Sequence, residues 1–219
     1  MKLRHLAPAA AAAAALFSYG TAHALTVIDF EADPGWVQAE GFLSGLFPLS
    51  FFSDLGMGLE LATIPEGDGN SLLARNDTNG NFIKGVFNDG AHSFLSMTFG
   101  NDDPAFTNPG DRAVLTVYNG AALVGATFVV FNRNDLMDQT IGFNFGPFDN
   151  WTLAYTDAAG SVFTGGGGAA TGLIEVIDNI TFDDGVGAVV PEPAAWTMMI
   201  MGFGGVGALT RRRRWLAIA

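Results

Sequence analysis

The sequence predicts an all-β fold, an antiparallel β-sandwich, and three observations lead to it. No apolar pattern of helical period persists for ten residues anywhere between Leu25 and Val190. Short apolar or alternating stretches recur there instead, separated by turn residues at intervals of roughly eight to twelve positions. The chain has 29 glycines and no cysteine, so its predicted domain of about 165 residues needs a core of its own rather than disulfides.

The alternating stretches place the strands. Leu95, Met97 and Phe99 alternate with polar residues, as in a strand buried on one face, and Asn119-Gly120 predicts a hairpin turn between two longer strands. The aromatic-rich segment Gly35–Gly56 fits no single strand. We expect strands at residues 25–31, 57–63, 71–75, 81–87, 93–99, 112–118, 123–131, 140–145, 150–156, 161–164 and 172–182.

The C-terminal segment has three parts in a fixed order. Pro191-Glu192-Pro193 is followed by an uncharged apolar run, Ala194–Thr210, and then by four arginines, Arg211–Arg214. The prolines keep the first part extended. The run is long enough for a transmembrane helix at the lower limit of length, and the arginines would hold its end on the cytoplasmic side.

This tail resembles the PEP-CTERM sorting signal of exported bacterial proteins. The resemblance implies processing by exosortase, transient anchoring in the inner membrane, and delivery to the cell surface or an extracellular polysaccharide matrix. Such tails are also catalogued as an ice-binding protein C-terminal domain, a label that is no evidence of ice binding. An ordinary membrane anchor is the alternative. The matching residues are Pro191, Glu192, Pro193, Trp196, Gly202, Gly204, Arg211, Arg212, Arg213 and Arg214.

The N-terminus predicts a secretory signal peptide with a short signal helix. Lys2 and Arg4 precede the apolar stretch Leu6–Phe17, and Ala22 and Ala24 form a cleavage site of the A-x-A type. We therefore expect the secretion translocon and signal peptidase as partners. The predicted organisation is a signal peptide at 1–24, a β-sandwich at 25–188 and the sorting signal at 189–219.

The charge of the predicted mature domain excludes some partners. Between Leu25 and Val190 there are four basic and 21 acidic residues, a formal charge of −17. Nucleic acid and anionic membrane surfaces would be repelled. Calcium is compatible with this charge, because it takes several oxygen ligands from carboxylates and loop carbonyls.

The first and last predicted strands are similar to those of carbohydrate-binding-module jelly rolls. The similarity covers Ile28–Glu31 and Ile177–Phe182, and it favours jelly-roll topology. It implies a structural calcium ion held by Glu31, Asp33 and Asp178. Two other acidic loops, at 76–81 and at 101–103, are weaker calcium candidates, and an ordinary Asn- and Asp-rich turn is the alternative for the first.

The residues offer little for catalysis. His92 is the one histidine of the mature domain, and its turn-like surroundings predict an exposed loop position rather than a catalytic triad. A glycosidase would need a pair of carboxylates, which sequence spacing does not reveal. Trp36, Trp151 and Tyr118 are candidates for stacking on a sugar. Trp151 alternates with Leu153 and Tyr155, so all three are expected to face the core, whereas Trp36 follows Pro34-Gly35 and is the better candidate.

Two functional classes follow from these observations. The favoured one is a non-catalytic, exported surface or matrix protein, with polysaccharide as its candidate ligand. An inert structural component of the envelope is the form of this class without a ligand. The alternative is a secreted hydrolase acting on polysaccharide through a carboxylate pair.

Overall fold

The computed structural model describes residues 24–45, 47–53, 58–64, 69–74, 82–163 and 173–183. Apart from Ala24 they belong to one compact unit, Leu25–Gly187. The predicted signal helix, the membrane-spanning run and the sorting residues lie outside the described residues. Within the described ranges, no helix has the length and apolar character needed to cross a membrane.

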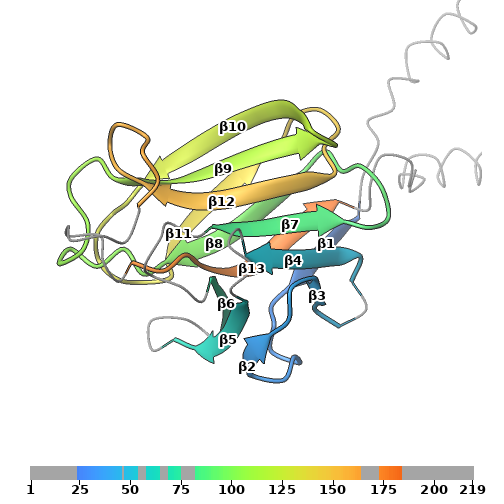
Figure 1. The fold of residues 1–219 in the computed structure, drawn as a ribbon, viewed down its shortest axis with the longest axis horizontal. Helices are drawn as coiled ribbons and strands as arrows, with labels where there is room; N and C mark the ends of the chain where they lie inside the picture. Colours follow the sequence, from blue (N-terminus) through green and yellow to red (C-terminus); the bar gives the residue numbers. More distant parts are fainter. Residues whose placement is uncertain are drawn as a thin grey trace, which may run out of the picture. The chain divides into compact units, whose positions relative to one another are not determined.

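One layer of the unit is a six-stranded antiparallel sheet, which runs across the front of Figure 1. Its order is β10-β9-β12-β7-β4-β3. The bounds are Phe42–Leu43 for β3, Leu49–Ser53 for β4, Ile83–Phe87 for β7, Arg112–Asn119 for β9, Ala122–Val130 for β10 and Asn150–Thr156 for β12.

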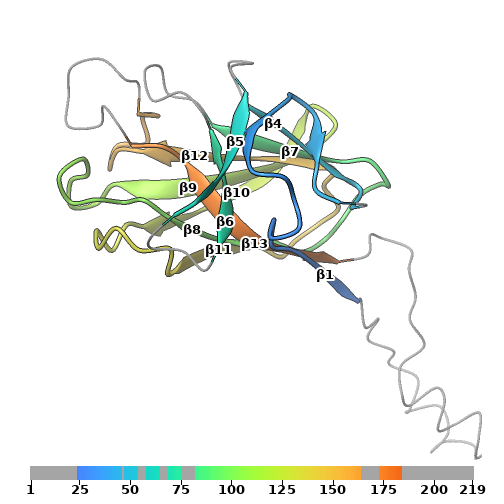
Figure 2. The same cartoon turned by 90° about the horizontal axis from the view of Figure 1, so that it is seen from below.

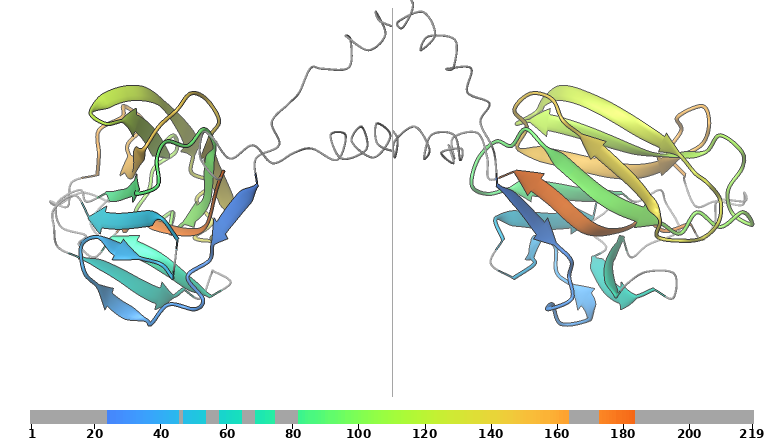
Figure 3. Two further views of the ribbon diagram at one scale, coloured as in Figure 1. Left: turned by 90° about the vertical axis from the view of Figure 1, so that its right-hand side faces the viewer. Right: turned by 180° about the vertical axis from the view of Figure 1, so that it is seen from behind.

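The second layer is a seven-stranded sheet, seen from behind on the right of Figure 3. Its order is β11-β8-β13-β6-β5-β2, with β1 also paired to β13. The bounds are Leu25–Ile28 for β1, Trp36–Gln38 for β2, Leu59–Thr63 for β5, Asn70–Ala74 for β6, Leu95–Gly100 for β8, Gln139–Phe143 for β11 and Val176–Asp183 for β13.

Strand β13 holds the second sheet together by changing partner along its length. It pairs with β8 on one side, while on the other it pairs with β6 at Val176 and Ile177 and with β1 from Ile180 onward. The register with β8 shifts between Asp178 and Thr181. Asn179 has a positive φ there, so the strand bulges where it leaves β6 and meets β1 (Figure 2).

The order of the strands confirms the predicted sandwich. From β6 onward the chain passes from one sheet to the other at every connection except the β9–β10 hairpin. Such repeated crossing between two packed sheets is the strand pattern of a jelly roll. The hairpin turns at Asn119-Gly120, as predicted, with Gly120 at a φ of 58°.

The core lies between the two sheets and confirms the predicted inward face of β12. Trp151, Leu153 and Tyr155 are all fully buried. The indole of Trp151 lies over Gly85, its cross-strand neighbour, where an added Cβ would be 2.2 Å from the ring. The whole core cluster is made by residues between Ile28 and Phe182, so Leu25–Gly187 has a hydrophobic core of its own.

Several local predictions are corrected by the structure. The first strand ends at Ile28, because Phe30 turns into a left-handed conformation with φ of 57°. No strand forms among the described residues 161–163, where a single bridge joins Val162 to Thr156. The segment Gly35–Gly56, which the sequence left without an assigned strand, contains β2, β3 and β4 in its described residues. His92 is completely buried, not exposed in a loop.

Candidate functional site

The outward face of the six-stranded sheet carries rows of side chains set by strand register. In one row Phe52, Lys84, Thr152 and Thr116 are successive cross-strand neighbours on β4, β7, β12 and β9. In the next row Asn150 lies opposite Tyr118. Because alternate residues of these strands point into the core, this face collects the remaining polar and aromatic side chains.

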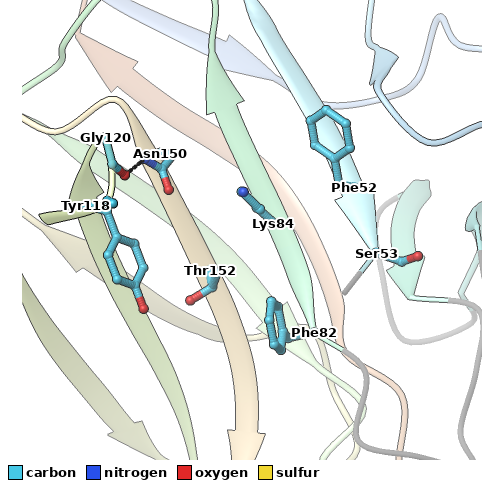
Figure 4. A pocket seen from close by; sticks show the side chains of 9 residues that line it. Phe52, Ser53, Phe82, Lys84, Tyr118, Gly120, Asn150 and Thr152 are labelled. Carbon is cyan, nitrogen blue, oxygen red and sulfur yellow. Dashed lines mark hydrogen bonds between the residues drawn. The ribbon is translucent and has the colours of Figure 1, made fainter. Parts of the chain in front are cut away.

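A hollow of about 460 Å³ opens over these rows. Figure 4 shows Lys84 near its centre, Phe52 beyond it on one side, and Thr152 and Tyr118 on the other. The amide of Asn150 donates a hydrogen bond to the carbonyl oxygen of Gly120, 2.9 Å away, which fixes that end of the hollow. The lining residues are Phe52, Ser53, Phe82, Lys84, Tyr118, Gly120, Ala121, Asn150 and Thr152.

A second hollow of about 410 Å³ adjoins the first on the same face. The two share Phe82, Tyr118 and Thr152, so we treat them as one groove. Arg112 and Phe128 line the second hollow, with the guanidinium carbon 4.8 Å from the ring centroid. The groove therefore offers aromatic rings, hydroxyl and amide groups, and two cationic side chains.

The three predicted calcium ligands have separate partners. Glu31 accepts a hydrogen bond from the backbone N–H of Asn70 at 2.7 Å. Asp33 accepts bonds from the Ser44 hydroxyl and from the backbone N–H of Gly45. Asp178 is buried and accepts a bond from the next backbone N–H.

The structure does not bring these three carboxylates together. In the ranges that the structure describes, no three His, Cys, Asp or Glu side chains form a group that could hold a metal ion. Calcium binding stays a prediction, which thermal unfolding with calcium and with chelator would check.

The remaining site predictions are placed only in part. The backbone of Trp36 lies in β2, opposite Leu61, but its side chain is outside what the structure describes. The acidic loop at 76–81 also lies outside it. In the third calcium candidate, Asp102 is fully buried and accepts bonds from the backbone N–H groups of Arg133 and Asp135, so it holds a loop.

His92 belongs to a buried polar cluster that is structural. Its Nε2 lies 2.9 Å from Asp89 Oδ1, and its Nδ1 lies near both the carbonyl and the carboxylate of Asp183. Ser93 donates to the same carboxylate through its hydroxyl and its backbone N–H. Histidine and serine thus both bind Asp183, and no hydrogen bond between them is present, so the geometry is not that of a catalytic triad.

Burial and hydrogen bonding shift the pKa of Asp183 in opposite directions. Burial alone would raise the pKa of its carboxyl group, but the hydrogen bonds from Ser93 and from the Phe94 backbone, together with the His92 charge, lower the pKa below its ordinary value. The carboxylate therefore stays ionised within this end of the sandwich.

Glu175 is a buried carboxyl group whose pKa is raised, whereas that of Asp183 is lowered. Burial raises its pKa to about 8, against a backbone hydrogen bond from Tyr155 that lowers it. Burial, together with the charge of Glu175, also raises the pKa of the Tyr155 hydroxyl well above its usual value. Both groups lie in the interior, away from the groove, and they are neutral at neutral pH.

The comparison with known families concerns the C-terminal tail. Residues 189–214 match the model of the PEP-CTERM protein-sorting motif. The tail carries a PEP-CTERM signal. The signal indicates an exported protein that is processed at the membrane, and it implies exosortase as the processing partner. None of the curated proteins matches the sequence.

Several solved structures are similar to this PEP-CTERM chain at low sequence identity. An arabinose-bound MgGH51 α-L-arabinofuranosidase matches 74% of this chain at 11% identity and a TM-score of 0.44, and the chain spans about a quarter of it (26%). The xylan-binding module CBM15 matches 75% of this chain and 99% of its own length at 9% identity, with a TM-score of 0.36. CsCBM6-3 from Clostridium stercorarium, in complex with cellobiose, matches 64% of this chain and 98% of its own length at 14% identity, with a TM-score of 0.34.

The groove was not predicted from the sequence. Tyr118, Lys84 and Thr152 come from three strands that are distant along the chain, and only the register places them side by side. The expected inward face of Trp151, Leu153 and Tyr155 leaves Thr152 pointing outward. Which outward residues are neighbours depends on the order β9-β12-β7-β4, which the alternation does not contain.

Proposed function

We propose that this exported protein binds an extracellular polysaccharide in the groove on the outer face of its six-stranded sheet. The observation that carries the proposal is the composition of the groove. Tyr118, Phe82 and Phe52 offer ring faces, and Thr152 and Asn150 offer hydroxyl and amide groups between them. A sugar ring has the complementary surface, with an apolar C–H face and hydroxyl groups at its edge.

The shape of the groove supports an extended ligand. The two hollows adjoin along the sheet, and their combined lining crosses β4, β7, β12, β9 and β10. A site for a small molecule is usually a deeper pocket that encloses most of its ligand. An open groove on a rigid sheet suits a polymer that passes through it.

In this proposal export and binding belong to one process. The N-terminal signal peptide directs the domain across the membrane, exosortase cleaves the PEP-CTERM tail there, and the sandwich then meets polysaccharide at the surface or in the matrix. A strongly acidic, cysteine-free domain stays soluble there without disulfides.

The hydrolase alternative requires carboxylates in contact with the sugar. None of the described residues that line the groove is an aspartate or glutamate. In a glycosidase the acid and its partner flank the scissile bond. The groove therefore supports binding without hydrolysis.

The test is a binding panel of neutral and charged polysaccharides with the unit Leu25–Gly187. Tyr118→Ala should weaken binding by about tenfold, the effect of losing a central aromatic contact. The matched control is Phe145→Ala, because Phe145 is a 75% exposed aromatic residue that lines neither hollow. Equal affinity of both variants and the parent would contradict the proposal, and release of new reducing ends would favour the hydrolase.

A further inference from the structure

The groove gathers positive charge in a domain that has very little of it. The predicted mature domain contains only four basic residues, Arg75, Lys84, Arg112 and Arg133. Two of them, Lys84 and Arg112, line the groove. With 21 acidic residues in the same domain, a random surface of this size would be expected to be acidic.

Lys84 has no acidic partner in the part of the chain that the structure describes. No ion pair or hydrogen bond joins its ammonium group to a described residue. The side chain is half-buried between Phe52 and Thr152, its neighbours on the flanking strands. A partly desolvated cation without a counter-charge costs free energy, so this one is available to a ligand.

Arg112 repeats this arrangement at the other end of the groove. One of its terminal nitrogens donates to the carbonyl oxygen of Ala158, 2.8 Å away. Its Nε is buried and has no hydrogen-bond partner, and no described carboxylate pairs with the guanidinium. Thr156 pairs with Arg112 and Thr152 with Lys84, so the backbone positions of the two basic residues are about 13 Å apart along the strand direction.

Two described carboxylates beside the lining residues are already hydrogen-bonded. Asp149 accepts bonds from the backbone N–H of Gly120 and from the Asn150 amide. Glu40 accepts bonds from the hydroxyl and the backbone N–H of Ser53. Neither lines the groove, so they hold its walls rather than neutralise its cations.

We propose that the polysaccharide bound in the groove is anionic, with carboxylate or sulfate groups on its sugars, and that Lys84 binds one of these groups. This inference rests on the proposed function and names the ligand class for the same groove. Arg112 binds a second group farther along the polymer. Charge complementarity at the two contacts selects the ligand, while the aromatic rings bind its sugar faces.

The net charge of the domain opposes this ligand at a distance. A domain of charge −17 repels a polyanion, but the Debye length is about 8 Å at physiological ionic strength, so most of the repulsion is screened. The contact between a half-buried ammonium group and an anion is screened less. Binding should therefore be weaker at very low salt than at about 0.1 M, opposite to the behaviour of a basic protein.

The test compares polymers that differ only in charge. The unit Leu25–Gly187 is titrated with polygalacturonate and with its fully methyl-esterified form, and separately with dextran sulfate and dextran. We expect binding to polygalacturonate, dextran sulfate or both, and at least about tenfold weaker binding to the neutral counterparts. The two charged polymers separate a carboxylate preference from a sulfate preference.

Substitutions assign the charge effect to the groove. Lys84→Met should weaken binding of the charged polymer about tenfold, and Lys84→Arg should retain most of it. Thr140→Glu is the control, because Thr140 is exposed on β11 of the other sheet and the change lowers the net charge by the same one unit. It should leave the affinity unchanged.

The outcomes separate this inference from the proposed function. Equal affinity for charged and neutral polymers, or an affinity unaffected by Lys84→Met, overturns the anionic ligand and leaves polysaccharide binding standing. Loss of affinity in Thr140→Glu as large as in Lys84→Met assigns the effect to net charge and also overturns it. Failure to bind any polymer, neutral or charged, overturns both.

Discussion

The two faces of the six-stranded sheet are built from the same strands and have opposite roles. On β12, Trp151, Leu153 and Tyr155 point inward and are fully buried, while Asn150 and Thr152 point outward into the groove. Side chains one residue apart on β12 therefore contribute to two different free energies, that of folding and that of binding. The inward ones contribute to folding and the outward ones to binding.

Alternation of inward and outward side chains along a strand divides substitutions in this sheet into two groups. An inward substitution should change the free energy of unfolding and affect binding only through the loss of folded protein. An outward substitution should change affinity at nearly constant stability. The following predictions test that division, beginning with the largest expected effect.

Trp151→Ala should cost about 3 to 5 kcal/mol of unfolding free energy, because it removes the largest fully buried side chain and leaves a cavity. Urea unfolding would measure it. The neighbouring Thr152→Ala, on the outward face, should change the same quantity by less than about 0.5 kcal/mol. Similar losses for both variants would contradict the division between the faces.

Glu175→Gln should make the protein more stable at alkaline pH. Because the folded-state pKa of Glu175, about 8, lies above its ordinary value of 4.5, its contribution is fully present below about pH 4.5 and is lost as the pH rises to about 8. Glutamine does not titrate and abolishes that loss. Above pH 8 the free energy of unfolding of the variant should therefore exceed that of the parent by a few kcal/mol.

Urea midpoints between pH 4 and pH 9 check this prediction. Asp183 has a lowered pKa, so the stability that it contributes is lost only as the pH falls through its folded-state value. The loss of stability between about pH 4.5 and about pH 8 therefore belongs to Glu175. Parallel stability curves for the variant and the parent would show that the carboxyl group is not held protonated.

Gly85→Ala should cost about 1 to 3 kcal/mol, because its Cβ would overlap the Trp151 ring. Thermal unfolding of the single variant and of the double variant with Trp151→Phe would test the cause. A smaller ring should relieve the overlap, so the two changes should cost less together than the sum of the singles. Additive losses would assign the effect to the backbone of β7 instead.

Tyr118→Ala should have only a small effect on stability, below about 1 kcal/mol, although it is predicted to weaken polysaccharide binding. Its side chain is half-buried and lines the groove rather than the core. Differential scanning calorimetry of the variant beside Phe145→Ala would measure it. A large loss of stability would mean that the outward face also supports the fold.

Much of the fold could be predicted because alternation and turn residues act locally. β12 was predicted with its bounds, Asn150–Thr156, and the β9–β10 hairpin from Asn119-Gly120. His92 was misjudged, because its ring packs against Phe87 and Phe182 and lies near Asp183, 91 positions away. The groove and the close approach of Gly85 to Trp151 likewise depend on strand pairing, which local patterns do not specify.

The position of β13 has a consequence for the timing of export. It is the last strand among the described residues, yet it lies inside its sheet, with β8 on one side and β6 and β1 on the other. The sheet of an exported chain is therefore incomplete until residues near 183 have crossed the membrane, and its closing contacts join segments that are far apart in the chain. Folding of this sheet thus has to follow export rather than precede it.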